Sequence, residues 1–142
     1  MRIRLAILTT MVLIAVCAAP LMAHHSVASE FDASKVMTIK GVITRLEWIN
    51  PHAWIYMEVK TVDGKIESWR VELGAPNSLF RDGFRKELVN LTDTYTMEMW
   101  LARNGSKIGG GRVLTLPDGR KFDVSDKFSQ GPIIFSPGGG TR

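Results

Sequence analysis

The sequence contains almost no cysteine. Its 142 residues include only Cys17, and a lone thiol forms no disulfide within the chain, so a hydrophobic core must stabilise the fold. Common catalytic patterns are also missing, because there is no G-x-S-x-G elbow and no recognisable pair of acid and base carboxylates. The glycine string Gly109-Gly110-Gly111 lacks the lysine of a phosphate-binding loop, and we expect it to form a flexible hairpin turn. The sequence therefore predicts a protein that is not an enzyme.

Long apolar runs are confined to the beginning of the chain. Arg2 and Arg4 precede the apolar stretch Leu5–Ala19, and the sequence "PLMA" then ends in the small residue Ala23. This order is typical of a secretory signal peptide, and the stretch is shorter than the about 20 residues of a membrane-spanning helix. We predict a signal peptide at residues 1–23 and a periplasmic or secreted protein with no stable membrane span after cleavage. An uncleaved membrane anchor is the alternative.

Removal of this segment changes the composition of the chain. The mature protein would begin with His24 and would contain no cysteine. Two of the 18 basic residues would leave with the signal peptide, so 16 basic residues would stand against 14 acidic ones. This near-neutral balance and the absence of a basic run argue against a nucleic-acid partner.

Apolar and polar residues alternate through most of the remaining chain, which is the pattern of β-strands. Three such segments follow one another at residues 37–49, 52–60 and 66–73. In the first segment the phase of the alternation changes, and we predict a bulge or bend at Gly41. A short helix should follow the third segment, with Asn77 or Ser78 as its cap and Gly83 at its end.

Strand alternation returns at residues 94–103 and 111–116, with a short additional segment at 121–124. Three strands, a short helix and two more strands follow the element order of the OB-fold, a partly open five-stranded barrel. We therefore predict an OB-fold-like all-β domain at residues 24–128, followed by a flexible Gly/Pro-rich tail at 129–142. A generic small β-sandwich is the alternative. The residues expected to form one core are Ile55, Met57, Val59, Trp69, Val71, Leu73, Met97, Met99 and Leu101.

The chain has only three histidines, and two of them, His24 and His25, lie next to the predicted cleavage point. Cleavage after Ala23 would give His24 a free α-amine beside its imidazole, and this pair of nitrogens is a chelating group for Cu(II). His52 lies behind the turn Asn50-Pro51 and would supply a second, well-oriented imidazole. We predict a copper site, a histidine brace, formed by His24 and His52 with His25 as an accessory residue.

Other interpretations of these histidines remain open. Zinc fits less well, because a structural zinc site takes four protein ligands and a carboxylate such as Glu30 or Asp32 would have to complete the set. A solvated histidine pair, with His52 hydrogen-bonded only within its turn, is another alternative. Copper oxidase or oxygenase chemistry is a further reading, but no substrate surface can be identified.

Aromatic residues support an alternative function. Trp48, Asn50, Trp54 and Asn77 would form a ligand-binding surface of a metal-free periplasmic module that holds a small ligand or another periplasmic protein. The Met97 and Met99 pair resembles soft copper ligands, but the alternation directs both residues into the core.

Several longer strings resemble a known family. They are "HHSVASEFD", "LEWINPHAWIYMEV", "GAPNSLFRDGF" and "LPDGRKF", and together they resemble the small exported bacterial proteins of the domain of unknown function 6152 family. The resemblance extends from about His24 to Val124 and departs at "VNLTDTY". It implies an exported β-barrel domain and carries no activity with it. The matching positions are His24, His25, Ser26, Trp48, Asn50, Pro51, His52, Gly74, Pro76, Asn77, Leu79, Arg81, Gly83, Asp118, Gly119 and Arg120.

Processing of the chain is directly testable. We expect the exported protein to begin with His24, because "PLMA" presents the small residue that signal peptidase requires. N-terminal sequencing of the protein recovered from the periplasm checks this. A first residue of Met1 or Pro20 would rule out a copper site built on the α-amine of His24.

Overall fold

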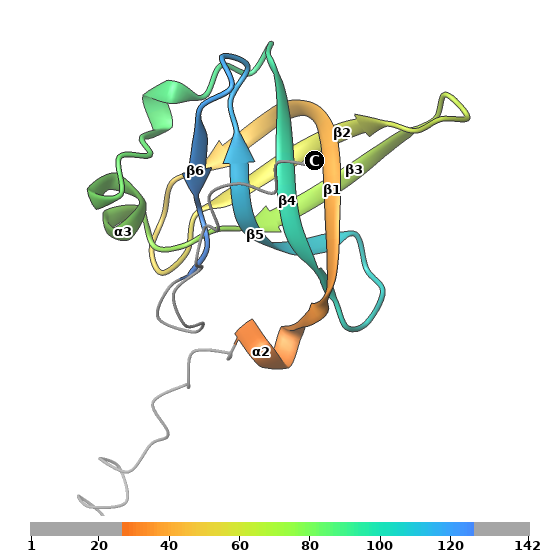
Figure 1. Cartoon of the computed structure of the whole chain (residues 1–142), viewed down its shortest axis with the longest axis horizontal. Coiled ribbons are helices and arrows are strands. Elements are labelled where there is room, and N and C mark those ends of the chain that lie inside the picture. Colours follow the sequence, from red (N-terminus) through yellow and green to blue (C-terminus); the bar gives the residue numbers. More distant parts are fainter. Residues whose placement is uncertain (1–26, 127–142) are drawn as a thin grey trace, which may run out of the picture.

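The computed structural model describes residues 27–126, which form one β-barrel with short helices at its ends (Figure 1). The signal peptide predicted at residues 1–23, the residues His24 and His25, and the tail predicted at residues 129–142 lie outside the described residues. The strands are β1 (Phe31–Glu47), β2 (Trp54–Lys60), β3 (Ile66–Glu72), β4 (Thr94–Ala102), β5 (Ile108–Thr115) and β6 (Lys121–Asp123). The helices are α2 (Val27–Glu30), α3 (Pro76–Arg81) and the 3-10 turn η1 (Lys86–Leu88).

The sheet closes on itself and confirms the predicted OB-fold-like barrel. Its strand order is β3-β2-β1-β4-β5-β6, and all these neighbours are antiparallel. An additional parallel pairing joins β3 to β5 over Arg70–Glu72 and Ile108–Gly110. This pairing turns the first five strands into an uneven ring, while β6 is attached only to β5.

Strand β1 bends so that it serves both sides of the barrel. It pairs with β4 from Phe31 to Val42 and with β2 from Val42 to Glu47. The predicted irregularity is present in β1, but its register shift lies between Ile43 and Arg45 rather than at Gly41. Gly41 has a different role. A Cβ atom there would lie 2.1 Å from the carbonyl oxygen of Glu58, so only glycine allows this approach of β1 to β2.

The predicted hairpin turn at Gly109-Gly110-Gly111 is also wrong, because these residues lie inside β5 and are buried. A Cβ atom at Gly109 would lie 2.3 Å from the sulfur of Met99, and one at Gly110 would lie 2.9 Å from the ring of Phe31. The glycines therefore make room for side chains that pack against the strand. The turn before β5 lies at residues 103–107.

The predicted short helix is present as α3, but it begins earlier than expected. Ala75 is its N-cap and makes no side-chain capping bond, and Pro76 occupies the first turn. Neither Asn77 nor Ser78 is therefore the cap. Proline is well suited to a first helical turn because its missing N–H would have no partner within the helix. The predicted end at Gly83 is confirmed, since this residue has a φ of 87°.

The predicted core is confirmed. Seven of its nine residues are buried, while Val59 and Leu101 are partly buried and pack against the same cluster. Trp100 points away from this core, as the alternation predicts, but it is only 6% exposed because it packs in a second cluster with Phe31 and Ala102. The beginning of β1 thus covers an outward-facing tryptophan.

Truncation of one core residue tests this packing. We expect Leu73→Ala to lower the free energy of unfolding by about 2–5 kcal/mol, because it removes a fully buried side chain and leaves a cavity. Urea denaturation measures the change. Val62→Ala, at a fully exposed position, is the control and should change the free energy by less than about 0.5 kcal/mol. Equal effects of the two substitutions would contradict the assignment of the core.

Candidate functional site

His52 lies in the connection between β1 and β2, two residues before β2 begins. The next residue, Ala53, anchors the backbone through both its N–H and its carbonyl group. The N–H of Ala53 donates to the carbonyl of Gly74, and the N–H of Leu73 donates to the carbonyl of Ala53. These bonds tie the His52 segment to the end of β3 and hold the imidazole at a defined place.

Two carboxylates flank the imidazole of His52. Its Nδ1 atom is hydrogen-bonded to Oε1 of Glu72, and its Nε2 atom lies 3.4 Å from Oδ2 of Asp126. The side chains of His52, Glu72 and Asp126 are only 17%, 12% and 15% exposed. Three distant segments, the start of β2, the end of β3 and the chain after β6, therefore meet at one partly buried polar cluster.

Backbone pairing explains why these segments meet. Trp54 pairs with Glu72 across β2 and β3, which places Glu72 beside the start of β2. The N–H of Gly74 donates to the carbonyl of Val124, which holds the chain after β6 against the end of β3. Gly74 is required there, because a Cβ atom at this position would lie 2.7 Å from the carbonyl oxygen of Ser125.

The cluster carries excess negative charge. Burial raises the pKa of Glu72, hydrogen bonding and charge attraction from His52 oppose this rise, and the carboxylates of Glu30 and Asp126 add to it. Glu30 is the last residue of α2. A cation placed here would relieve the repulsion among the carboxylates.

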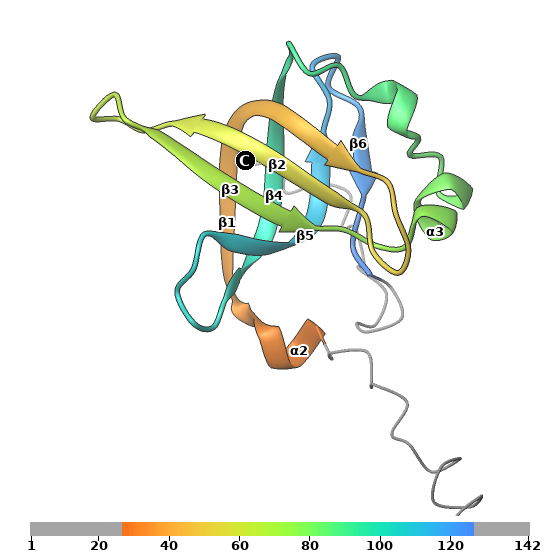
Figure 2. The same ribbon diagram turned by 180° about the vertical axis from the view of Figure 1, so that it is seen from behind.

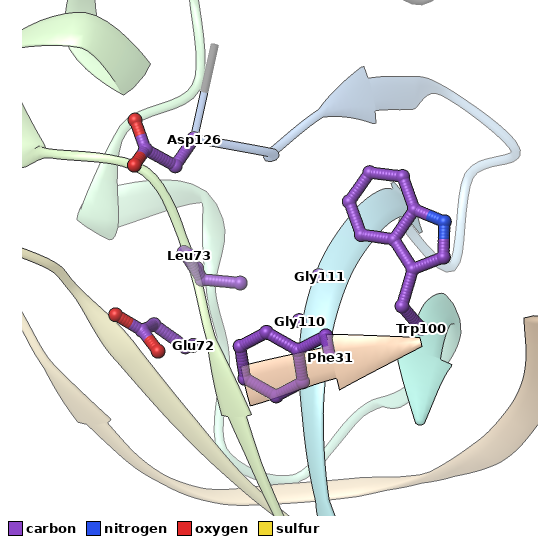
Figure 3. A pocket seen from close by; sticks show the side chains of 7 residues that line it. All are labelled: Phe31, Glu72, Leu73, Trp100, Gly110, Gly111 and Asp126. Carbon is purple, nitrogen blue, oxygen red and sulfur yellow. The ribbon is translucent and has the colours of Figure 1, made fainter. Parts of the chain in front are cut away.

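A hollow opens next to the cluster. It contains about 200 Å³ of space, part of which is open solvent. Figure 3 shows the carboxylates of Glu72 and Asp126 on one side and the rings of Phe31 and Trp100 on the other. Leu73, Gly110 and Gly111 complete the lining. The hollow therefore has an acidic side and an apolar side.

The geometry around His52 suits a metal ligand. A metal-bound histidine commonly donates its second ring N–H to a carboxylate, which fixes the orientation of the ring, and Glu72 is placed for this role. Two ligand atoms on one ion are about 3 Å apart when each metal bond is about 2.0–2.2 Å. The separation of His52 Nε2 and Asp126 Oδ2 is close to this value. Within residues 27–126, however, no three His, Cys, Asp or Glu side chains form a complete metal-binding group.

The four residues predicted to bind a ligand lie in the β1–β2 connection, at the start of β2 and in α3. Trp48 is partly buried and packs on Phe84 with ring centroids 5.9 Å apart. Trp54 lies under the guanidinium of Arg70, whose central carbon is 3.8 Å from the ring centroid. Asn50 and Asn77 are exposed. In the part of the chain that the structure describes, no ring contact joins Trp48 to Trp54.

The sequence analysis missed Glu72 and Asp126. Glu72 occupies the outward parity of β3, where a polar residue is ordinary, and Asp126 follows the last strand without a local motif. Only the long-range pairing of β2 with β3, and of the chain after β6 with Gly74, brings them to His52. A pattern within one segment gives no signal for such a site.

Comparison with known proteins identifies the family of this chain. A family model described as a family of unknown function, DUF6152, matches residues 11–111. The chain belongs to DUF6152. The match includes His24, His25 and His52 and ends in β5, before "LPDGRKF". No curated protein and no solved structure gives a significant match. None of the helices of this DUF6152 protein within residues 27–126 has the length and apolar composition needed to cross a membrane.

The raised pKa of Glu72 predicts a pH dependence of stability. A carboxyl with a raised pKa in the folded protein contributes stability that is present below its unfolded value and is lost as the pH rises through its folded pKa. We therefore expect the metal-free parent to lose stability relative to Glu72→Gln as the pH rises above 4.5. Urea midpoints measured over a pH series test this. Glu58→Gln removes an exposed carboxylate of β2 and controls for the loss of surface charge. If the difference in urea midpoint between the parent and Glu72→Gln does not vary with pH, the prediction is wrong.

Proposed function

We propose that this protein is an exported copper-binding module in which His24 and His52 hold one Cu(II) ion. The observation that carries the proposal is the position of His52. Its Nδ1 atom is fixed by Glu72, and its Nε2 atom faces Asp126 at the distance expected for two ligands of one ion. The copper ligand set would be the α-amine and ring of His24, Nε2 of His52 and a carboxylate oxygen of Asp126, with His25 as an accessory residue.

The position of α2 supports a contribution from His24. Helix α2 begins at Val27, three residues after His24, and three residues span at most about 11 Å. In both views the Val27 end of α2 lies on the side of the barrel where β6 ends (Figures 1 and 2). Asp126 follows β6, and Glu30 acts on Glu72 through its charge. This position of α2 supports the proposal that the first residues of the mature chain contribute to the cluster around His52.

The chemistry of the donor set favours copper over zinc. An α-amine and two imidazoles are nitrogen donors that can lie in one plane with Cu(II), which favours tetragonal nitrogen and oxygen coordination. The negative charge of Glu72 and Asp126 would compensate the charge of the ion in this partly buried place. Binding requires unprotonated amine and imidazole nitrogens, so copper affinity should fall on acidification.

The proposal includes processing and location. Cleavage after Ala23 would create the α-amine ligand, and the signal peptide would direct the protein to the periplasm or outside the cell. In this form the protein takes a metal ion as its ligand, with another periplasmic protein as a partner that would deliver or receive the ion. No chemical reaction is assigned to it.

A metal-free function is the second candidate, and one observation favours it. Both ring nitrogens of His52 already face carboxylates, so a protonated imidazole would make a closed charge cluster that only joins β2, β3 and the chain after β6. The protein would then be a ligand-binding or protein-binding module that uses aromatic residues on its surface.

Titration of Cu(II) into five forms of the processed protein separates the two functions. We expect His52→Ala and a form with one residue added before His24 to bind Cu(II) at least about tenfold more weakly than the parent, because each removes one nitrogen ligand. Asp126→Asn should weaken binding less, because an amide oxygen can still reach the ion. His25→Ala should have the smallest effect. Isothermal titration calorimetry measures the affinities.

Circular dichroism and urea midpoints control for the folding of each form. If the extended protein and His52→Ala bind Cu(II) as tightly as the parent, the copper site is wrong and the metal-free module remains. Trp100 adds a second readout, because it lines the hollow next to Asp126. Cu(II) should quench the fluorescence of the parent more than that of Trp100→Phe.

A further inference from the structure

Strands β2 and β3 lie in front in Figure 2. The register of these strands with β1 places two rows of side chains on the outer face of the sheet. The strand register aligns Arg45 with Tyr56 and Tyr56 with Arg70. In the neighbouring row it aligns Glu47 with Trp54 and Trp54 with Glu72. The basic row and the acidic row therefore run side by side across the same three strands.

Most charges of these two rows already have partners. Arg45 lies 3.3 Å from Glu47, Tyr56 donates its hydroxyl hydrogen to Glu47 at 3.2 Å, and Glu72 bonds to His52. Arg70 differs from Arg45, because within residues 27–126 it has no carboxylate partner. The face thus contains one exposed guanidinium whose charge is not compensated by an ion pair.

Aromatic rings hold this guanidinium in place. The central carbon of Arg70 lies 3.8 Å from the ring centroid of Trp54 and 5.9 Å from that of Tyr56. A second guanidinium, that of Arg45, lies against the same Tyr56 ring at 3.7 Å. Stacking on an aromatic face leaves the N–H groups at the edge of a guanidinium free to donate hydrogen bonds in its plane.

We propose that Arg70 is the centre of an oxyanion-binding site that takes the carboxylate or phosphate group of a ligand. A stacked guanidinium is pre-organised, so little side-chain freedom is lost when its paired N–H groups bind two oxygens of such a group. Arg45 adds a second positive charge beside it. The half-buried rings of Trp54 and Tyr56 provide a surface for the part of the ligand next to the oxyanion. This site is independent of the copper proposal, because it uses neither His52 nor His24.

The test uses the indole N–H signal of Trp54 in nitrogen-15-labelled processed protein, assigned with Trp54→Phe. Inorganic phosphate and glutarate are titrated separately, and sodium chloride keeps the ionic strength constant. We expect a saturable shift of the Trp54 signal in the parent. Arg70→Gln should weaken the apparent affinity at least about tenfold, because it removes a charged two-point hydrogen bond. Arg70→Lys should weaken it nearly as much, because an ammonium neither stacks flat nor presents a fork.

Arg85→Gln is the matched control. Arg85 is also exposed and stacked on an aromatic ring, 4.4 Å from the centroid of Phe80, but it lies outside the two rows. Its loss should leave the titration unchanged. Urea midpoints show whether each variant is folded, and Arg70→Lys keeps the positive charge if Arg70→Gln does not fold.

A second arm distinguishes the source of the oxyanion. Binding to phosphatidylglycerol vesicles, but not to phosphatidylcholine vesicles, that depends on Arg70 would support an anionic headgroup as the ligand. Binding to the free anions alone would support a soluble ligand. If Arg70→Gln and Arg70→Lys match the parent in both arms, or if sodium chloride alone produces the same shift, the proposal is wrong.

Discussion

The pairing of β3 with both β2 and β5 is the constraint on which the barrel and both candidate sites depend. The parallel pairing of β3 with β5 closes the ring over Arg70–Glu72. Gly111 makes room for this approach, because a Cβ atom there would lie 2.7 Å from Leu73 and 3.1 Å from the carbonyl oxygen of Glu72. Gly109 makes room for Met99 of the main core, and Gly110 makes room for Phe31 of the second cluster. On its other edge β3 pairs with β2, and this pairing places Glu72 beside His52 and Arg70 over Trp54.

The two sites share one strand register but differ in chemistry. Arg70 and Glu72 are separated by one residue on β3 and face the same side. Glu72 is partly buried and bonds to the imidazole of His52, while Arg70 is exposed and stacked on Trp54. Pairing with β2 thus places a cation-attracting cluster and an anion-attracting guanidinium next to each other. The two sites therefore select ligands of opposite charge. The acidic cluster attracts cations and repels anions, and the guanidinium of Arg70 does the reverse.

Much of the fold could be predicted from the sequence, since alternation depends only on local residue order. The strands, the α3 segment and the core around Leu73 were accessible in this way. The bulge after Ile43, the glycines within β5 and the partners of His52 were not, because each depends on contacts between segments distant in the chain. Asp126 is the clearest example: 74 residues separate it from His52, yet the two side chains are 3.4 Å apart.

A crystal structure of the processed protein grown with one equivalent of Cu(II), with copper located by its anomalous scattering, tests the copper site most directly. We predict a single copper ion bonded to the α-amine and ring of His24 and to Nε2 of His52, with the Nδ1 atom of His52 still bonded to Glu72. A copper ion found elsewhere, or a His52 ring that keeps both carboxylates while His24 remains unbound, would contradict a histidine brace in this protein.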